Sequence, residues 1–295
     1  MLRLSCEKAV ITVPPAEGLH VLPAAFDRSD QKPREPQQKE KNIDTVTARS
    51  LTVICGRERK RKHMNRIGII GAMEIEVARL KEMMTDVTVT KKASMEFNQG
   101  LLNGKPVVVV QCGIGKVNAG ICTQILVDDF QVDAVINTGV AGSLRNEINI
   151  GDIVISTDAV HHDMDVRALG YKKGQIPQID VFAFPADETM QKVAAEACRE
   201  VNPEIQVFSG RVLSGDQFIS DHGVKSVLVD ELDGFCTEME GAAIAQAAYL
   251  NHIPYVILRA ISDKADDSAT MDYPEFERKA AQHCVNLTQE MVKRL

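Results

Sequence analysis

Short, unbroken runs of apolar and β-branched residues recur between residues 64 and 295, where they alternate with segments of helical periodicity. Such runs predict buried strands, and the periodic segments predict helices that cover them. We expect strands at 67–70, 107–111, 134–137, 153–156, 210–213 and 256–261, and helices at 74–84, 118–128, 188–201, 241–251 and 273–294. This alternation is typical of a single α/β domain with a parallel or mixed sheet and helices on both faces.

The pattern is absent from the first 63 residues. They contain five prolines and a polar stretch at 28–42, and this composition predicts a disordered leader. They hold 13 Lys and Arg against 8 Asp and Glu, whereas residues 64–295 hold 21 against 33. We therefore divide the chain into a leader at 1–63 and one globular domain at 64–295.

The role of the leader stays open between three explanations. A transit peptide should be poor in acidic residues, and this segment has eight. The basic run at 57–63 is either a localisation signal or, as charge runs usually are, a solvated tail. In the third explanation the start is over-extended, and Met64 is the first residue of the physiological protein.

Composition narrows the function classes. The chain has 295 residues, is 44% hydrophobic and carries a net charge of −7, so it can build one large core and offers no basic surface to nucleic acid. No apolar run approaches the roughly 18 residues that a membrane helix needs. The seven cysteines are scattered without a CxxC pair, which argues against a disulfide framework or structural zinc. We expect a cytoplasmic enzyme that binds a small molecule.

Three carboxylates stand where a folded core normally tolerates none. Ser262 and Asp263 follow the apolar run at 256–261, at the end of a strand where open α/β sheets bind ligands. Glu238 and Glu240 directly precede a small-residue helix, so both lie near its positive end. Each motif alone is equally well explained as a helix cap. Together they indicate a polar ligand site.

A further acidic turn lies near the start of the domain. The run at 67–70 ends in a glycine turn that leads to Glu74 and Glu76. Glu74 is explained as a favourable charge in a first helical turn. Glu76 is a second acid in the same turn and is a candidate for another role.

Other polar motifs invite cofactor hypotheses that the residues do not support. The turn at 113–116 lacks the spacing of a phosphate-binding loop, and the loop expected at 138–142 lacks both the GxGxxG motif and the acidic residue of a dinucleotide site. The segment 161–165 combines imidazoles and carboxylates, but adjacent residues on a strand face opposite sides. We expect a polar loop there, and neither a metal nor a cofactor.

Seven motifs, in this order, resemble those of the 5'-methylthioadenosine/S-adenosylhomocysteine nucleosidases, and they span the chain from Met64 to Leu295. They are Gly71-Ala-Met-Glu-Ile-Glu76, Gly113-Ile-Gly-Lys-Val117, Asn137-Thr-Gly-Val-Ala-Gly142, Gly151-Asp-Ile-Val154, Ser214-Gly-Asp-Gln-Phe-Ile219, Glu238-Met-Glu240 and Arg259-Ala-Ile-Ser-Asp263. No single motif is specific, but their order is. The resemblance implies a twisted mixed sheet flanked by helices, of the nucleoside phosphorylase/hydrolase type, and favours Met64 as the start.

The resemblance also implies an activity: hydrolysis of the N-glycosidic bond of methylthioadenosine and S-adenosylhomocysteine, with 5'-deoxyadenosine as a further candidate, in methionine salvage and S-adenosylhomocysteine recycling. Cleavage leaves positive charge on the ribose and negative charge on the departing adenine, so an acid must protonate the purine and a base must activate water. By the resemblance Asp263 protonates N7 with Ser262 orienting it. Glu76 activates the water.

The roles around the sugar come from the same resemblance. Glu240 binds the ribose hydroxyls, and Glu238 with Met239 supports the sugar and the water. The backbone of Ala141 and Gly142 passes beneath the ribose.

The roles around the adenine and the 5' substituent follow in the same way. Phe218 stacks on the adenine, whose edge the backbone of Ile219 reads. Met73, Ile114 and Tyr273 surround an apolar 5' substituent. From the residues alone, such side chains are as often ordinary core.

Two positions near the ribose stand apart from these roles. Val140 stands where many of these nucleosidases have Ser, so a side-chain contact to the ribose is lost. Arg259 is expected to balance the acid cluster. The resemblance further implies a homodimer in which one loop enters the partner's site through its apolar residues, Val166, Leu169, Tyr171 and Pro177.

Two alternative functions are weighed against hydrolysis. A purine nucleoside phosphorylase needs cationic donors for phosphate, typically Arg, and the turn at 71–76 and the segment 138–142 contain none. A non-catalytic nucleoside-binding protein could dispense with the acid and the base, which are present here. Preference among 5'-thio nucleosides and aminodeoxyfutalosine-type substrates stays open.

Overall fold

The structure, a computed structural model, describes residues 64–295, and the expectations for the leader lie outside the described residues. Within them the chain forms ten strands, six α-helices and one short 3-10 helix. In chain order these are β1 (Ile67–Gly71), α1 (Glu74–Glu82), β2 (Thr85–Lys92), β3 (Met95–Leu102), β4 (Lys105–Gln111), α2 (Lys116–Asp128), β5 (Ala134–Ser143), β6 (Ile153–His161), η1 (Arg167–Leu169), β7 (Phe184–Pro185), α3 (Glu188–Val201), β8 (Val207–Ser214), α4 (His222–Leu232), β9 (Gly234–Glu238), α5 (Gly241–Leu250), β10 (Tyr255–Asp263) and α6 (Ala269–Arg294).

Every strand and helix expected from the pattern is present, and the mixed α/β fold is confirmed. The elements that were not expected are β2, β3, β7, β9, α4 and η1. β2 reads TDVTVTKK and is exposed along its whole length, because in the described part of the chain it is an edge strand that pairs with β3 alone. β7 is two residues long. Neither strand carries the apolar run by which buried strands are predicted.

Five strands close into a ring. β5 pairs along one edge with β10, in parallel from Val135 to Gly142. Its other edge is divided: the residues up to Asn137 pair with β1, and only Gly142 and Ser143 pair with β9. β9 continues through β8 and β6 back to β10, so the ring closes. β1, β4, β3 and β2 extend from it. The sequence pattern did not predict this closure.

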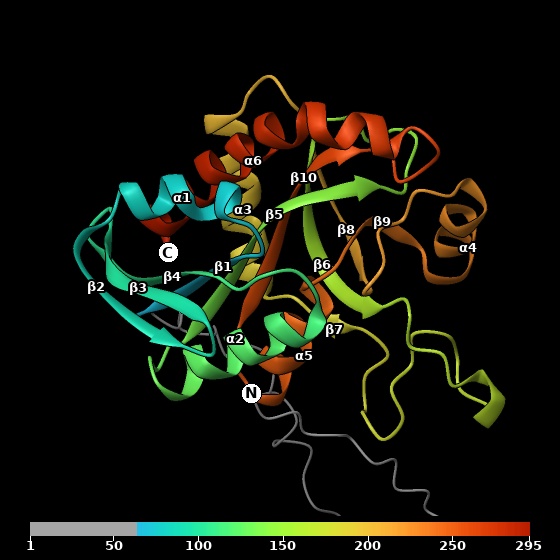
Figure 1. The fold of residues 1–295 in the computed structure, drawn as a ribbon, viewed down its shortest axis with the longest axis horizontal. Helices are drawn as coiled ribbons and strands as arrows, with labels where there is room; N and C mark the ends of the chain where they lie inside the picture. Colours follow the sequence, from blue (N-terminus) through green and yellow to red (C-terminus); the bar gives the residue numbers. More distant parts are fainter. Residues whose placement is uncertain (1–63) are drawn as a thin grey trace, which may run out of the picture. The chain divides into compact units, whose positions relative to one another are not determined.

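Helices cover the sheet on two faces, with α1, α3 and α6 on one and α2 and α5 on the other (Figure 1). Alternation along β1 makes this possible. Ile67 and Ile69 pack in one apolar cluster with Leu80 of α1, whereas Ile70 packs in a second cluster with Leu126 of α2. Both clusters are buried, so the strand ends between them are held by packing on both faces.

One local expectation is wrong, and a second holds only in part. The segment 138–142 was expected as a loop but continues β5, because β10 pairs with it as far as Gly142. The segment 161–165 was expected as a polar loop, and residues 162–165 do form a turn and loop, but His161 is the last residue of β6, and both it and His162 are buried. Pairing of β6 with β8 up to Ser214 carries the strand into this segment.

The described cysteines, Cys112, Cys122, Cys198, Cys236 and Cys284, are all buried free thiols. No helix within residues 64–295 is long and apolar enough to cross a membrane.

Candidate active site

The divided edge of β5 creates the site. Between Asn137, the last residue paired with β1, and Gly142, the first paired with β9, this edge has no strand partner among residues 64–295. The backbone there must find other partners, and Val140 does so through side chains. Its N–H donates to Oε1 of Glu76 at 3.0 Å, and its carbonyl accepts from Nη1 of Arg259 at 3.4 Å. Ligand sites in α/β sheets form where strand order changes in this way.

Glycines allow the close approach of charged side chains to β5. A Cβ atom at Gly139 would overlap both the guanidinium of Arg259 and the carboxylate of Glu76. A Cβ atom at Gly142 would lie 2.7 Å from Oδ1 of Asp263. These two glycines are three residues apart in a strand, which is about 10 Å. Glu76 and Asp263 therefore stand near two separated points of one strand.

Glu76 is held in place by backbone amides. It lies in the first turn of α1 and is buried, and its Oε2 accepts from the N–H groups of Ala72 and Met73 at 2.7 and 2.9 Å. With the Val140 N–H this makes three amide donors to one carboxylate, which favours its ionised form. Burial nevertheless outweighs Arg259 and these amides and raises the pKa of Glu76.

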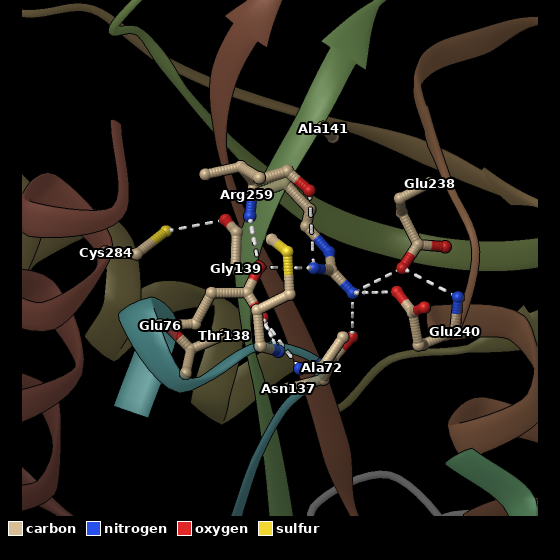
Figure 2. A network of polar contacts seen from close by, with 12 residues as sticks. Ala72, Glu76, Asn137, Thr138, Gly139, Ala141, Glu238, Glu240, Arg259 and Cys284 are labelled. Atoms are coloured by element: carbon tan, nitrogen blue, oxygen red, sulfur yellow. Dashed lines mark hydrogen bonds and ion pairs between the residues drawn. The ribbon is translucent and has the colours of Figure 1, made fainter. Parts of the chain in front are cut away.

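Arg259 joins three carboxylates (Figure 2). It comes from the middle of β10, and its side chain is only 1% exposed. Nη2 forms an ion pair with Oε2 of Glu238 and lies 3.7 Å from Oε2 of Glu240, and Nη1 lies 3.8 Å from Oε1 of Glu76. Burial lowers the pKa of Arg259, but Glu238, Glu76 and Glu240 more than offset this and raise it. Arg259 balances the acid cluster, as expected.

Glu238 ends β9 and faces the start of α5. Its carboxylate accepts from the Gly241 N–H at 3.0 and 2.8 Å and from the Glu240 N–H at 3.2 Å. Ser214 Oγ donates to the same carboxylate and accepts from the Ala242 N–H at 2.6 Å. The expectation that these acids lie at the positive end of a helix is confirmed.

Glu240 is the residue that precedes α5, and it is buried. Its Oε1 accepts from the Gly115 N–H at 2.8 Å. Burial, followed by the charge of Glu238, raises the pKa of Glu240 to about 7, against the opposing effects of Arg259 and the Gly115 amide. Three carboxylates share one guanidinium, so the protein gains by keeping one of them protonated at lower pH.

Asp263 closes β10 on the other side of β5. It is buried, its Oδ1 accepts from the Ala265 N–H at 2.8 Å, and Ser262 Oγ donates to its Oδ2 at 2.9 Å. Ser262 also lies 3.4 Å from the Ala141 carbonyl. Burial raises the pKa of Asp263 despite both hydrogen bonds. A buried carboxyl with a raised pKa can carry a proton to a ligand.

Apolar and aromatic side chains lie next to these acids. The Tyr273 hydroxyl lies 3.3 Å from Sδ of Met73 and donates to Glu277 at 2.8 Å. The ring of Phe218 meets that of Tyr273 edge to face at 5.8 Å. Phe218 remains 50% exposed, which is unusual for a core aromatic and suits a side chain that contacts a ligand.

The remaining candidates fall into three environments. Ile114 is 56% exposed in the turn before Gly115, Met239 is half-buried between the two glutamates, and Ile219 is buried. Ala141 and Gly142 are buried in β5. In the loop 162–183, Leu169 is 73% exposed, whereas the other residues expected to reach a partner are half-buried. They are Val166, Tyr171 and Pro177.

Sequence reasoning missed several groups that complete the network. Asn137 accepts from Arg259 Nη2 at 2.6 Å and donates to the Ile70 carbonyl at 3.0 Å. Ser214 and the Val140 N–H, described above, were also missed. Asn137 and Ser214 stand in motifs that carry the resemblance, and that was the available signal. Within residues 64–295 no group of three or more His, Cys, Asp or Glu side chains is placed to hold a metal ion.

Comparisons with known proteins identify the family of this chain. A model of the Phosphorylase superfamily matches residues 66–293. The 5'-methylthioadenosine/S-adenosylhomocysteine nucleosidase of Anoxybacillus flavithermus is 44% identical over 230 residues, which are 78% of this chain and 98% of the relative.

Two solved structures are also similar. One is the same nucleosidase from Neisseria meningitidis in complex with methylthio-immucillin-A, with 38% identity, a TM-score of 0.76, and coverage of 79% of this chain and 100% of the other. The other is the native futalosine hydrolase of Helicobacter pylori, with 32% identity, a TM-score of 0.75, and coverage of 79% and 99%. Fold and site thus define a member of the Phosphorylase superfamily. Within it, the chain belongs to the 5'-methylthioadenosine/S-adenosylhomocysteine nucleosidase family.

The raised pKa of Glu240 predicts a pH-dependent cost in stability. Between pH 5 and 8 this glutamate is mostly ionised in the unfolded chain, whereas in the folded protein it gives up its proton only as the pH passes about 7. The folded state therefore binds more protons, and the free energy of unfolding falls as pH rises. Glu240→Gln removes this cost and still offers an oxygen to Gly115. We expect the difference in unfolding free energy between variant and wild type to shift in favour of the variant by on the order of 2 kcal/mol from pH 5 to pH 8. Denaturant unfolding at the two pH values measures it.

Glu74→Gln provides the matched control, because Glu74 is also a glutamate at the start of a helix but is exposed. Its effect should stay within about 0.5 kcal/mol at both pH values. A stability difference between Glu240→Gln and wild type that is the same at pH 5 and pH 8 would contradict the raised pKa.

Proposed function

We propose that the protein hydrolyses the N-glycosidic bond of 5'-methylthioadenosine and S-adenosylhomocysteine, releasing adenine and the thioribose product. The observation that carries this proposal is the placement of two buried carboxyl groups, Asp263 and Glu76, at separated points along β5. An inverting hydrolysis needs an acid and a base far enough apart to hold a sugar and a water between them. Membership of the nucleosidase family supports the same reaction.

Asp263 acts as the general acid. Burial raises its pKa, which favours the protonated form, and protonation at N7 lets adenine leave as a neutral molecule. The Ser262 hydroxyl and the Ala265 N–H fix its orientation.

Glu76 acts as the general base. An ionised carboxylate only accepts hydrogen bonds, and the three amides that hold Glu76 favour that state. Burial raises its pKa, which makes the ionised form a stronger base towards water. Activity should therefore fall as pH falls through the pKa of Glu76 and as pH rises through that of Asp263.

Glu240 binds the ribose hydroxyls, and Glu238 and Met239 support the sugar and the attacking water. The proposal rests on the position of these residues beside Arg259 and the free edge of β5. The backbone of Ala141 and Gly142 lies along the ribose. Negative charge from the carboxylates also stabilises the positive sugar of the transition state.

Adenine stacks on Phe218 and is read by the backbone of Ile219. Met73, Ile114 and Tyr273 surround the 5' substituent. Phe218 is half exposed and contacts Tyr273, and the Tyr273 hydroxyl contacts the thioether of Met73. Such surroundings suit a thioether better than a phosphate.

Phosphorolysis is disfavoured by charge. Arg259 is already surrounded by Glu76, Glu238 and Glu240. A phosphate dianion entering this cluster would meet net negative charge instead of the cationic donors that phosphate requires.

A cytoplasmic homodimer is part of the proposal. Leu169, at 73% exposed, is carried on the short helix η1 between Val166 and Tyr171, and Val117 and Ile121 of α2 are exposed by 72% and 43%. Single exposed apolar side chains are common, but several that lie together favour burial in an interface. A second copy of the chain would bury them, with Val166, Leu169, Tyr171 and Pro177 entering its site.

The first test is the reaction itself. The full chain should release adenine from methylthioadenosine and S-adenosylhomocysteine in phosphate-free buffer with chelator, and the sugar product should be the free thioribose. Futalosine-type nucleosides serve as competing substrates in the same assay, because one structural relative is a futalosine hydrolase. Ribose 1-phosphate as the product, or a requirement for phosphate, would refute hydrolysis.

The second test concerns the acid. Asp263→Asn keeps the shape and the hydrogen bonds but cannot donate the proton, so kcat should fall by roughly 10²-fold or more with a smaller change in substrate Kd. The alkaline limb of the pH profile should disappear with it. Asp267→Asn, four residues on and exposed, should keep normal turnover. Near-normal turnover of Asp263→Asn would exclude Asp263 as the acid.

The third test concerns the dimer. Leu169→Asp places a charge on the exposed apolar loop and should convert a dimer to a monomer in sedimentation equilibrium, with a higher KM for thioether substrates because the partner's residues leave the site. Val87→Asp changes an apolar side chain that is 45% exposed on the edge strand β2, and should leave the assembly unchanged. A wild-type chain that is active as a monomer would contradict the proposal.

A further inference from the structure

A second polar cluster lies beside the carboxylate network and joins three segments of the chain. Nζ of Lys116, at the start of α2, contacts both oxygens of Asp163 at 2.6 and 2.7 Å. Asp163 follows β6 and also accepts from the Asp216 N–H at 3.1 Å. Asp216 follows β8, and its Oδ1 accepts from the backbone N–H of Lys116 at 2.8 Å. The three residues thus form a closed set of contacts.

The cluster holds one backbone amide in a constrained position. Gly115 directly precedes Lys116, has a φ of 99°, and donates its N–H to Glu240 at 2.8 Å. This φ favours glycine, and a Cβ atom at Gly115 would lie 3.1 Å from Oδ1 of Asp216. The Gly115 N–H therefore points to Glu240, and the Lys116 N–H points to Asp216. A shift of Asp216 or Lys116 must displace the Gly115 N–H, which is the donor that Glu240 accepts from.

We propose that Lys116, Asp163 and Asp216 form a clamp that positions the Gly115 amide against Glu240, and that the clamp thereby sets the ionisation of the sugar-binding carboxylate. These three are positioning residues, because they act through Gly115 and Glu240. The importance of this ionisation for catalysis rests on the proposed function, whereas the positioning itself does not.

The partial burial of the Lys116–Asp163 pair supports this role. Their side chains are 22% and 19% exposed, so the pair is better shielded than most surface ion pairs, which contribute little. Burial acts to raise the pKa of Asp163, but Lys116 and the Asp216 amide outweigh it and lower that pKa. The lowered pKa favours the ionised form of Asp163, which is the form that pairs with Lys116.

Other charges face Glu240 and fix the sign of the effect. Glu238 on β9 and Glu76 on α1 disfavour its ionised form, and Arg259 on β10 favours it. Cys112 at the end of β4 is buried and neutral, because burial raises its thiol pKa. Against this background the Gly115 N–H favours the ionised form, so loosening the clamp should raise the pH at which Glu240 ionises.

The test breaks the same ion pair from both ends. The acid limb of the kcat/KM profile for methylthioadenosine then contains a step from Glu240, the sugar ligand, beside that from Glu76, the base. Asp163→Asn and Lys116→Met should each move the Glu240 step upward by about one pH unit, and the double variant should move it no further. Lys116→Arg can still pair with Asp163 and should restore the wild-type profile. At pH 6 the two single variants should lose activity through KM more than through kcat.

A direct readout makes the test independent of activity. Labelling with ¹³C-carbonyl isoleucine and ¹⁵N-glycine selects the four Ile-Gly pairs of the sequence, one of which is Gly115. Its amide proton shift should follow the ionisation of Glu240 in the wild type and be lost as a titration in Glu240→Gln. In Asp163→Asn the midpoint should lie at higher pH and the amplitude should be smaller.

The matched control is the pair of Arg211 and Asp158, which joins β8 to β6. It has similar geometry, 2.6 and 3.1 Å, and similar exposure, 24% and 23%. Asp158→Asn should lower the melting temperature without moving the Gly115 titration or the acid limb. An unchanged Gly115 titration in both Asp163→Asn and Lys116→Met would overturn the clamp. A wild type that releases no adenine while Gly115 still titrates as described would instead count against the proposed function alone.

Discussion

The buried guanidinium of Arg259 is the interaction on which the site depends. An isolated buried cation costs several kcal/mol, and so does each buried carboxylate. Neither Arg259 nor its acidic neighbours could stay in the core alone. Together with Asn137 and the amides at the start of α5 they form a connected set in which each charge has partners. Removing one member leaves the others buried and uncompensated, which costs more than the lost contact itself.

This dependence explains why the cluster lies where two branches of the sheet separate. A fully paired β5 would have no free backbone for Glu76 and Arg259 to contact, and a side chain at position 139 would exclude both. The free edge between the β1 and β9 branches supplies polar partners inside a well-packed domain. Three carboxylates around one cation are easier to bury when one of them can take up a proton, and the pKa of Glu240, raised to about 7, makes this residue suited to do so.

The sequence predicted the parts of this arrangement that depend on local pattern. Apolar runs located the central strands, and the acids at 238, 240 and 263 were assigned to the ends of elements where the structure has them. The ring closure was missed because β5 and β9 pair through only two residues. The contact between Gly115 and Glu240 joins residues 125 positions apart, and periodicity carries no information at that range. Val140 was assessed only by its side chain, but it contributes through its backbone N–H. Every residue except proline has this group, so the sequence gives no signal for the contact.

The divided edge of β5 also has a consequence for folding. The site needs β1, β5, β9 and β10 together, and these strands come from both ends of the described chain. Contacts between distant segments form slowly, because the chain entropy of closing long loops opposes them. Helices and the β2–β3 hairpin need only local contacts. Catalytic competence is therefore expected to be among the last properties a refolding chain acquires, after most of its helix content has returned.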